Sequence, residues 1–363
     1  MDFSSPDYEK QREAILKTDI KSMTLTELTE FVVSLGEKSF RAKQLYQWMH
    51  QKLAVSFDQM SNLPASFRKK LEENAHLTAL KQADVRISQI DGTRKYLFAL
   101  HDGHVIESVL MKYKFGNSVC ISSQVGCRMG CKFCASTLDG LARNLTAGEM
   151  LDQIYRIQQD LGERVSHVVI MGSGEPFDNY DSVLRFLDLI SDENGLNIGQ
   201  RNLTVSTCGL VPQIRDFARR KPQVTLALSL HAPNDEVRKT LMPIANAYRL
   251  TDVLAACREY SEITGRRMTF EYSLVAGVND NEKEARELGN LLRNFPCHVN
   301  LIPVNPIKER QFTRSDRTNI EKFKISLEKY GINVTIRREM GRDIDGACGQ
   351  LRKSYIDRLN EKE

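Results

Sequence analysis

The sequence predicts an α/β protein built on a partial (β/α)6 barrel, with a small N-terminal helical domain and a β-meander extension. Three observations predict this fold. Residues up to about Asn74 show helical periodicity, two Asp-Gly pairs then separate β-rich runs, and from Ser118 onward apolar strands alternate with helices. We expect a helical accessory domain over 1–78, an antiparallel extension over 79–115, the barrel over 116–351 and a C-terminal tail over 352–363.

The helical domain begins with Thr24-Leu25-Thr26-Glu27, which has the Ser/Thr-x-x-Glu spacing of a capping box. Gly36 ends the apolar-periodic stretch that follows. Two more helices are expected over 41–53 and 64–71. The domain is locally basic, through Lys38, Arg41, Lys43, Arg68, Lys69 and Lys70. Such a face is either solvated or turned toward a nucleic acid such as RNA.

The extension is marked by Asp91-Gly92 and Asp102-Gly103, which predict two-residue hairpin turns. Its strands are expected over 85–90, 96–100 and 105–113, and the last of them leads directly into the first barrel strand, 118–122.

The barrel is predicted from repeated strand–helix units, which imply a parallel sheet with crossover helices. The remaining strands are expected over 168–171, 203–206, 224–230, 268–275 and 299–304, with a late strand over 333–337. The helices are expected over 147–161, 182–190, 213–219, 251–263, 282–295 and 320–330. Six core strands are too few for a closed eight-stranded barrel, so the sheet should stay open. Its ligands should lie at the carboxyl ends of the strands.

Composition narrows the class of protein. The chain has 363 residues, 41% of them hydrophobic and 27% charged, as in a soluble globular protein. No apolar run is long enough to cross a bilayer, and the first residues do not resemble a secretory signal, so we expect a cytoplasmic location. A net charge of +4 is too slight to indicate nucleic-acid binding by itself. Eight cysteines in such a chain favour metal, redox or catalytic roles over a disulfide framework.

The most specific signal is Cys127-x3-Cys131-x2-Cys134, in the loop after the first barrel strand. Three thiolates can bind three irons of a [4Fe–4S] cluster and leave the fourth iron open for a substrate. Gly126 and Gly130 would let this loop fold tightly. The alternatives are three buried or free cysteines, or a zinc site, but zinc requires a fourth ligand that no nearby Cys or His provides. The spacing therefore predicts a cluster that cleaves S-adenosylmethionine into a radical.

A cofactor pocket is expected at the same rim. Gly172-Ser173-Gly174-Glu175-Pro176 follows the second core strand, where a carboxylate can accept hydrogen bonds from a cofactor ammonium group. A phosphate-binding loop is the alternative for a Gly-x-Gly sequence. Polar groups also follow three other strands, at Ser206-Thr207, Ser229-Leu230-His231 and Asn305-Pro306. His231 could instead be a hydrogen-bonded core residue.

These motifs together resemble the RlmN-type radical S-adenosylmethionine RNA methyltransferases, whose relatives include the Cfr resistance methyltransferases. The matching stretches are 118–134, Gly174-Glu175-Pro176, 229–234, 300–306 and 343–351, and the resemblance extends over nearly the whole chain from about Arg41. One departure is Ser173, where many members have methionine. Cofactor binding should survive this change, whereas the packing around Ser173 is open.

The resemblance implies a radical-SAM barrel that methylates C2 of an adenosine in 23S ribosomal RNA, in the peptidyl-transferase region, and in some members an adenosine in the anticodon stem-loop of certain tRNAs. It implies a [4Fe–4S] cluster on Cys127, Cys131 and Cys134 and two molecules of S-adenosylmethionine per turnover. It places the cofactor contacts at Gly174, Glu175, Ser206, Ser229, Leu230, His231 and Asn305. A family proton acceptor matches Glu107, which without the resemblance would be taken for a solvated strand carboxylate.

The resemblance also assigns two further thiols. Cys348, in a Gly/Asp-rich loop, would first receive a methyl group from one cofactor molecule. The 5′-deoxyadenosyl radical from a second molecule would take a hydrogen from that methyl, and the resulting methylene radical would add to the adenine. Cys120 would resolve the adduct through a transient Cys120–Cys348 disulfide. Cys208, Cys257 and Cys297 lie in apolar contexts and are expected to be small buried hydrophobic residues.

Three rival functions remain open on the sequence. One is a C8-adenosine methyltransferase of the Cfr kind, although those relatives tend to lack the proline that here is Pro176. The second is a radical enzyme acting on a small molecule, and the third is an iron–sulfur or zinc RNA-binding module. For the leading function we expect 23S rRNA and tRNA as partners, an electron donor such as flavodoxin, no membrane, and a monomer.

Overall fold

The computed structural model describes residues 17–307 and 309–344. Within them, the predicted α/β fold with an open parallel sheet is confirmed. One ten-stranded sheet has the order β14-β13-β12-β11-β10-β9-β6-β5-β4-β3 and ends in two separate edge strands. Its parallel strands are β6 (Gly116–Ile121), β9 (Val165–Ile170), β10 (Leu203–Thr207), β11 (Thr225–Ser229), β12 (Met268–Leu274), β13 (Cys297–Pro303) and β14 (Asn333–Ile336).

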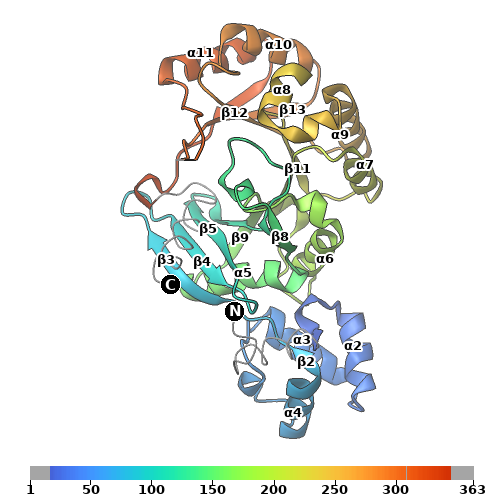
Figure 1. Cartoon of the computed structure of the whole chain (residues 1–363). Coiled ribbons are helices and arrows are strands. Elements are labelled where there is room, and N and C mark those ends of the chain that lie inside the picture. The colour runs from blue at the N-terminus through green and yellow to red at the C-terminus, as the bar shows by residue number, and fades with distance from the viewer. Residues whose placement is uncertain (1–16, 308, 345–363) are drawn as a thin grey trace.

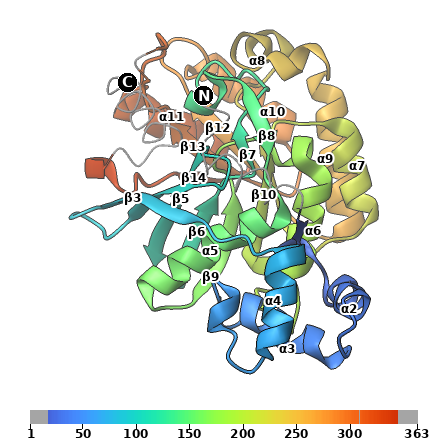
Figure 2. The ribbon, with the colours of Figure 1, turned by 60° about the horizontal axis from the view of Figure 1, so that its bottom comes forward.

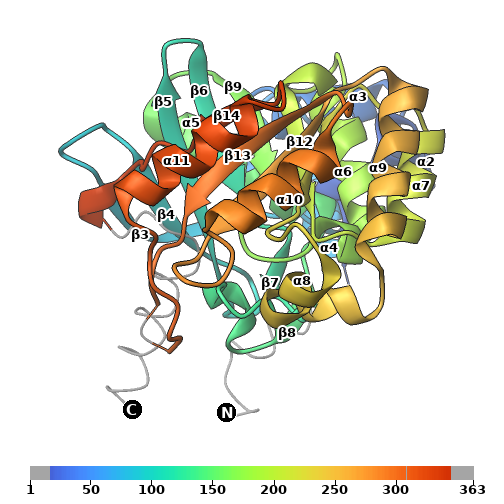
Figure 3. The same ribbon diagram turned by 90° about the horizontal axis from the view of Figure 1, so that it is seen from above.

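Crossover helices cover the outer face of this sheet. They are α5 (Ala147–Leu161), α6 (Tyr180–Ser191), α7 (Val211–Arg219), α8 (Asp235–Leu241), α9 (Leu250–Thr264), α10 (Glu282–Leu292) and α11 (Arg317–Glu328). Figure 3 shows α6, α7 and α9 side by side, and α10 and α11 beside β12 to β14. The short α8 was not predicted, because its seven residues give too little periodicity to detect. None of the helices in the described part of the chain could reach across a bilayer.

The antiparallel extension belongs to the same sheet. Its strands β3 (Lys81–Ile87), β4 (Arg94–Ala99) and β5 (Val105–Tyr113) pair in sequence and join the parallel part through β6. The predicted two-residue turns are wrong, since residues 88–93 and 100–104 connect the strands. The carboxylates of Asp91 and Asp102 accept hydrogen bonds from the backbone N–H groups of Thr93 and His104, two residues on, and these side-chain turns lengthen the connections.

The N-terminal helices α2 (Leu25–Ser34), α3 (Phe40–His50) and α4 (Ala65–Asn74) form a separate group below the sheet (Figures 1 and 2). Two short strands, β1 (Thr18–Asp19) and β2 (Ala75–His76), close this group. The predicted capping box is present, with both the Thr24 and Glu27 bonds formed. A fully buried ion pair between Lys21 and Asp152 of α5, with a Nζ–Oδ1 distance of 2.6 Å, attaches the group to the barrel.

The sheet has two chemically different faces, because successive side chains of a strand point to opposite sides. On β6, Val119 and Ile121 belong to the main hydrophobic core beneath the helices. Cys120 lies between them in sequence and therefore points to the inner, concave face. On β12, Phe270 and Tyr272 join the helix-facing core in the same way, so that Glu271 points inward. The inner face thus carries the charged Glu271 and the thiol of Cys120, beside apolar residues such as Val109 and Met111.

Candidate active site

The cysteine motif is held by a small two-stranded sheet that the sequence did not predict. β7 (Gln124–Gly126) pairs antiparallel with β8 (Leu141–Asn144), and the three cysteines lie in the connection between them. Gly126 has φ +76°, and a Cβ there would lie 2.0 Å from the carbonyl oxygen of Gly140. The Cys127 N–H donates to that same carbonyl at 2.8 Å. The expected need for glycine at position 126 is therefore confirmed.

The three thiols lie close enough together to affect one another electrostatically. Cys127 and Cys131 are buried and Cys134 is half-buried. Burial raises the pKa of Cys127 to about 12, and Cys134 and Glu175 add to the effect. Burial also raises the pKa of Cys131, with further contributions from Cys134 and Cys127. At these buried positions Cys127 and Cys131 are thiols unless a cation compensates their charge, which is what a metal site does.

The geometry of the loop bears on the kind of metal site. Among the described residues, no group of three His, Cys, Asp or Glu side chains converges on a single ion. A cubane cluster makes a different demand, because each thiolate binds its own iron and the sulfurs stay further apart.

The glycine motif after β9 packs directly against the segment that enters the cysteine loop. Gly174 has φ +110°, and a Cβ there would lie 2.7 Å from both Ser123 and Gln124. Glu175 is buried, and its two carboxylate oxygens accept hydrogen bonds from the N–H groups of Phe177 (3.1 Å) and Cys208 (2.8 Å). Burial raises the pKa of Glu175, while these bonds oppose the shift. The carboxylate is thus fixed at the rim by the backbone.

Ser173, the departure from the family pattern, is well accommodated. Its side chain is buried and lies 3.1 Å from the hydroxyl of Ser136, oxygen to oxygen. Its N–H donates to Ser122 Oγ, and its carbonyl accepts from Ser123 and Gln124. The serine therefore links the glycine motif to the turn that follows Cys134.

Other predicted cofactor contacts gather at neighbouring strand ends. Ser206 of β10 and Ser229 of β11 bring their hydroxyl oxygens to 3.4 Å. Leu230 follows and is fully buried, whereas Asn305, beyond the end of β13, is exposed. Of the predicted ring of polar strand ends, the parts at β10 and β11 therefore lie side by side. Asn305 follows β13 and is exposed to solvent.

His231 combines the two interpretations that the sequence left open. It is buried with φ +55°, and its Nδ1 accepts a hydrogen bond from the Ser273 N–H at 2.9 Å. Burial and then the charge of Arg238 lower its pKa to about 3. Its ring also contacts Phe133, within the cysteine motif, edge to face at 4.8 Å between centroids. It is a hydrogen-bonded core residue that touches the candidate cluster loop.

Cys120 and Glu107 share the inner face of the sheet. Cys120 is buried in a cluster with Val109 and Met111, against which Met340 packs. Glu107 of β5 is 4% exposed, and its Oε2 lies 3.4 Å from the Nζ of the fully buried Lys95. The interpretation of Glu107 as a solvated carboxylate is therefore wrong, because its strand is covered on both faces.

Cys348 lies outside the described residues. Met340, eight residues before it in the sequence, brings the chain to the Cys120 cluster.

Several residues of this region were missed by the sequence. Arg238 of α8 is fully buried and donates to the carbonyls of Cys208 (2.6 Å), Leu230 (3.2 Å) and Ser229 (3.3 Å). Glu271 accepts a hydrogen bond from Asn300 at 2.9 Å on the inner face. A charged residue at an alternate position of an apolar strand, as in Phe270-Glu271-Tyr272, was the available signal. Cys208 was expected to be only apolar filling, yet its N–H fixes Glu175.

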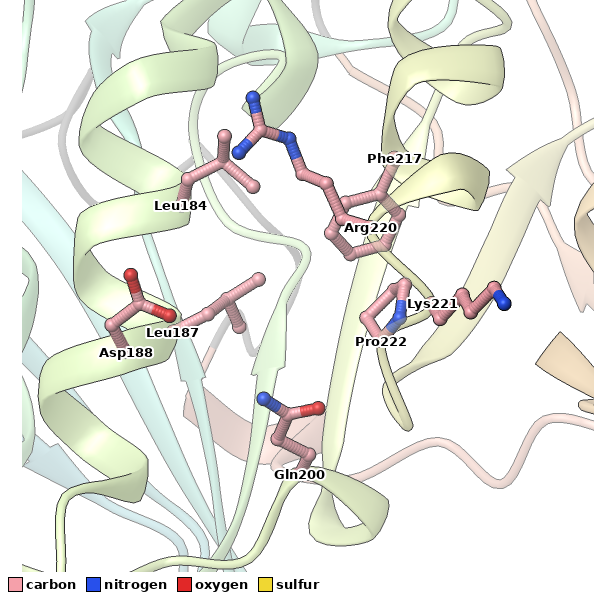
Figure 4. A pocket seen from close by; sticks show the side chains of 8 residues that line it. All are labelled: Leu184, Leu187, Asp188, Gln200, Phe217, Arg220, Lys221 and Pro222. Carbon is pink, nitrogen blue, oxygen red and sulfur yellow. The ribbon is translucent and has the colours of Figure 1, made fainter.

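A separate cavity of about 200 Å³ lies elsewhere on the barrel. Figure 4 shows Leu184, Leu187 and Asp188 of α6 on one side and Phe217 and Arg220, from the end of α7, on the other. None of the predicted site residues lines it, so it plays no part in the site built above.

Comparisons with known proteins identify both parts of the chain. A sequence-family model described as the ribosomal RNA large subunit methyltransferase N-terminal domain, RlmN_N, matches residues 18–77. The model of the radical SAM superfamily matches residues 121–289. A probable dual-specificity RNA methyltransferase RlmN from Lachnospira eligens is 60% identical over 346 residues, covering 95% of this chain and 99% of the relative. Its counterpart from Clostridium novyi is 55% identical, covering 93% and 98%.

The fold and the cofactors agree with these matches. A crystal structure of a radical SAM methyltransferase from Sphaerobacter thermophilus has a TM-score of 0.88 and 44% identity, covering 92% of this chain and 98% of that one. Radical SAM proteins use a [4Fe–4S] cluster and S-adenosylmethionine. The residues fit such a cluster, which is anionic once three thiolates bind it. Arg238 supplies a buried positive charge near Cys131, and within the described residues its Nη1 has no hydrogen-bond partner. The chain therefore belongs to the RlmN family of radical SAM RNA methyltransferases.

Proposed function

We propose that this RNA methyltransferase modifies C2 of an adenosine in 23S ribosomal RNA, in the peptidyl-transferase region, and an adenosine in the anticodon stem-loop of some tRNAs. The observation that carries the proposal is the position of Cys120. This thiol lies on the inner face of the sheet, on the strand that leads into the cysteine loop, and the chain toward Cys348 packs beside it. A radical enzyme for small molecules has no evident use for a further thiol on this face, outside the cysteine loop.

Two groups of residues would have distinct tasks at the rim. Cys127, Cys131 and Cys134 would hold the cluster, and Gly174, Glu175, Ser206, Ser229, Leu230, His231 and Asn305 would hold the methionine and adenosine parts of S-adenosylmethionine. When bound, the cluster and S-adenosylmethionine would supply a carbon radical at the inner face of the sheet. The fixed Glu175 carboxylate can accept hydrogen bonds from the cofactor ammonium group, which is a charge-assisted interaction.

The protein's own chemistry would pass through two thiols and one carboxylate. Cys348 would carry the methyl group as a thioether and deliver its carbon to the adenine. Glu107 would accept the proton from C2, and the unpaired electron of the adduct would return to the cluster. The Cys120 thiolate would then attack the Cys348 sulfur, so that the S–C bond breaks, a disulfide forms and the released methylene carbon takes up a proton to give the methylated base. Cys120 and Glu107 are suitably placed, since both lie on the inner face of adjacent strands. A disulfide of this kind in a reducing compartment is transient.

The C8 assignment is the alternative, and Pro176 favours C2 because C8 relatives tend to lack this residue. The test is to incubate the anaerobically reconstituted protein with a 23S rRNA fragment or tRNA and S-adenosylmethionine, and to identify the modified nucleoside by mass spectrometry against both isomers. We expect 2-methyladenosine from both RNAs. Formation of 8-methyladenosine would overturn the C2 assignment, and product from one RNA alone would overturn dual use.

The partners complete the proposal. Residues 1–78 would form an accessory domain that contacts the RNA, and exposed Lys38, Lys43 and Lys69 give its surface the required charge. The boundaries of the extension and barrel, 79–115 and 116–351, remain as proposed above. We propose a cytoplasmic monomer that receives electrons from a donor such as flavodoxin.

A further inference from the structure

A buried ion pair lies near Cys120, the proposed resolving thiol. Lys95 of β4 has a fully buried side chain, Glu107 of β5 is 4% exposed, and Nζ and Oε2 are 3.4 Å apart. Withdrawing two charges from water carries a desolvation penalty that apolar side chains avoid, so an ion pair is a poor choice for filling a sheet face if only stability matters. Apolar side chains fill neighbouring positions of the same sheet, as Val109 does. A contribution to the stability of the fold therefore does not explain the presence of the Lys95–Glu107 pair.

The strand register brings this ion pair to the same sheet face as Cys120. Lys95 is the cross-strand partner of Val109, and Val109 is the partner of Cys120, so the three residues share one face across three strands. Glu107 lies two residues from Val109 along β5 and is thus the diagonal neighbour of Cys120, roughly 7–8 Å away between Cα atoms.

Glu107 and Lys95 lie at different distances from the rim of the sheet that carries the cysteine loop. The Ser122 hydroxyl donates to the Glu107 carbonyl at 2.7 Å, which places Glu107 at the carboxyl end of β6, toward the cysteine loop. Lys95 pairs with Val109, further from that rim. The ammonium group therefore approaches the carboxylate from inside the protein.

We propose that Lys95 is a positioning residue for Glu107 as the acceptor of the adenine C2 proton, an inference that rests on the proposed C2 methylation. In this step the C2–H bond breaks, an O–H bond forms on Glu107, and the bonding electron pair stays with the ring. A buried ammonium 3.4 Å from the carboxylate holds one of its oxygens and so fixes the direction in which the other can face the base. Lys95 would act through Glu107 and not on the base itself.

The chain offers a matched control. Lys112 of the same meander pairs with Glu163 at 3.1 Å, but their side chains are 39% and 54% exposed. Lys112→Met removes a Lys–Glu pair of similar length without disturbing the inner face. Lys95→Met removes the buried charge, and Lys95→Arg keeps the charge while altering its reach.

The experiment measures proton removal directly. Wild type and the three variants are reconstituted and given RNA with protium or deuterium at C2 of the target adenosine, and 2-methyladenosine and 5′-deoxyadenosine are both quantified. For Lys95→Met we expect product formation to fall at least about tenfold, part of what a general base contributes. The C2 deuterium isotope effect should rise above wild type, and more 5′-deoxyadenosine should form per product. Lys95→Arg should recover part of the rate, and Lys112→Met should match wild type.

Each other outcome has a definite meaning. If Lys95→Met is slow but keeps the wild-type isotope effect and product ratio, or matches Lys112→Met, the positioning role is overturned. If thermal unfolding shows that Lys95→Met does not fold, Lys95→Arg decides, because an unchanged isotope effect in that variant also overturns the role. If wild type makes no 2-methyladenosine, the C2 assignment itself is overturned.

Discussion

The cysteine loop and the inner face of β4 to β6 solve the problem of placing thiols in opposite ways. In the loop, Cys127, Cys131 and Cys134 lie within eight residues, and glycines with positive φ fold the backbone around them. On the strands, Cys120, Glu107 and Lys95 come from three segments, and only side-chain alternation and strand register bring them to one face.

The two regions should differ in how well they tolerate amino-acid substitutions. The loop depends on backbone conformations that residues other than glycine rarely adopt, so even a small steric change there should weaken cluster binding. The strand site is held by a continuous hydrogen-bonded ladder, so single side chains can change while the scaffold remains. Variants of the loop should therefore lose radical formation, whereas variants of the strand site should keep it and fail later.

The largest effect is expected for the loop thiols. Cys127→Ala leaves an iron without its ligand, so cluster content and 5′-deoxyadenosine formation should be lost together. Iron and sulfide analysis after anaerobic reconstitution, followed by chromatography of the nucleosides, measures both. Cys257→Ala, at a fully buried position of α9, is the control and should retain them. A full cluster in Cys127→Ala would contradict the proposed ligand set.

The strand site should fail at a later step. Cys120→Ala should still form 5′-deoxyadenosine but accumulate protein joined covalently to RNA through Cys348, because no thiol resolves the adduct. Denaturing gel electrophoresis with labelled RNA detects the adduct. Cys297→Ala, on β13 and in the helix-facing core, should turn over normally. Normal turnover without adduct in Cys120→Ala would refute the resolving role and remove the contrast between the regions.

An intermediate effect should follow from the loop backbone alone. Gly126→Ala combines φ +76° with a methyl group 2.0 Å from the Gly140 carbonyl oxygen, a strain of about 2–3 kcal/mol, so less cluster should be retained. Gly140→Ala has a similar φ of +69° but meets nothing within 4 Å, and should cost about 1 kcal/mol. Iron content and Tm of the two variants separate steric from conformational strain. Equal losses would show that the close approach is unimportant.

The smallest effect concerns how the extension is attached. His101, in the β4–β5 connection, lies 3.7 Å from Glu149 of α5, Nδ1 to Oε1, and the interaction with Glu149 raises the pKa of His101. A raised pKa means that the stabilisation is present below pH 6.5 and is lost as the pH rises through the folded-state pKa. His101→Asn should therefore lower the free energy of unfolding by about 0.5 kcal/mol at pH 6, and by less at pH 9.

Tm measurements at the two pH values test this small effect. In His298→Asn the trend should reverse, since burial lowers the pKa of His298 and its protonation opposes folding. A pH-independent loss in His101→Asn would show that the ion pair contributes nothing.

The sequence predicted the parts of the site that are contiguous in it. The cysteine spacing, the glycine motif and the polar ends of β10 and β11 could be recognised because each lies within a few residues. Lys95 and Glu271 could not be assigned, because what makes them important is the face they share with residues on other strands. The turn lengths were predicted wrongly for a different, local reason: the carboxylates of Asp91 and Asp102 accept hydrogen bonds from N–H groups two residues on, and these bonds compete with the tight turn that Asp-Gly favours.

Arg238 has a mechanical consequence for the rim. One guanidinium group bonds to the backbone beyond β10, at Cys208, and to the backbone at the end of β11, at Ser229 and Leu230. Cys208 in turn bonds to Glu175, at the end of β9. Three neighbouring strand ends are thus linked in series and must shift together. A displacement at Ser229 would therefore strain the hydrogen bonds that lead through Arg238 and Cys208 to the Glu175 carboxylate.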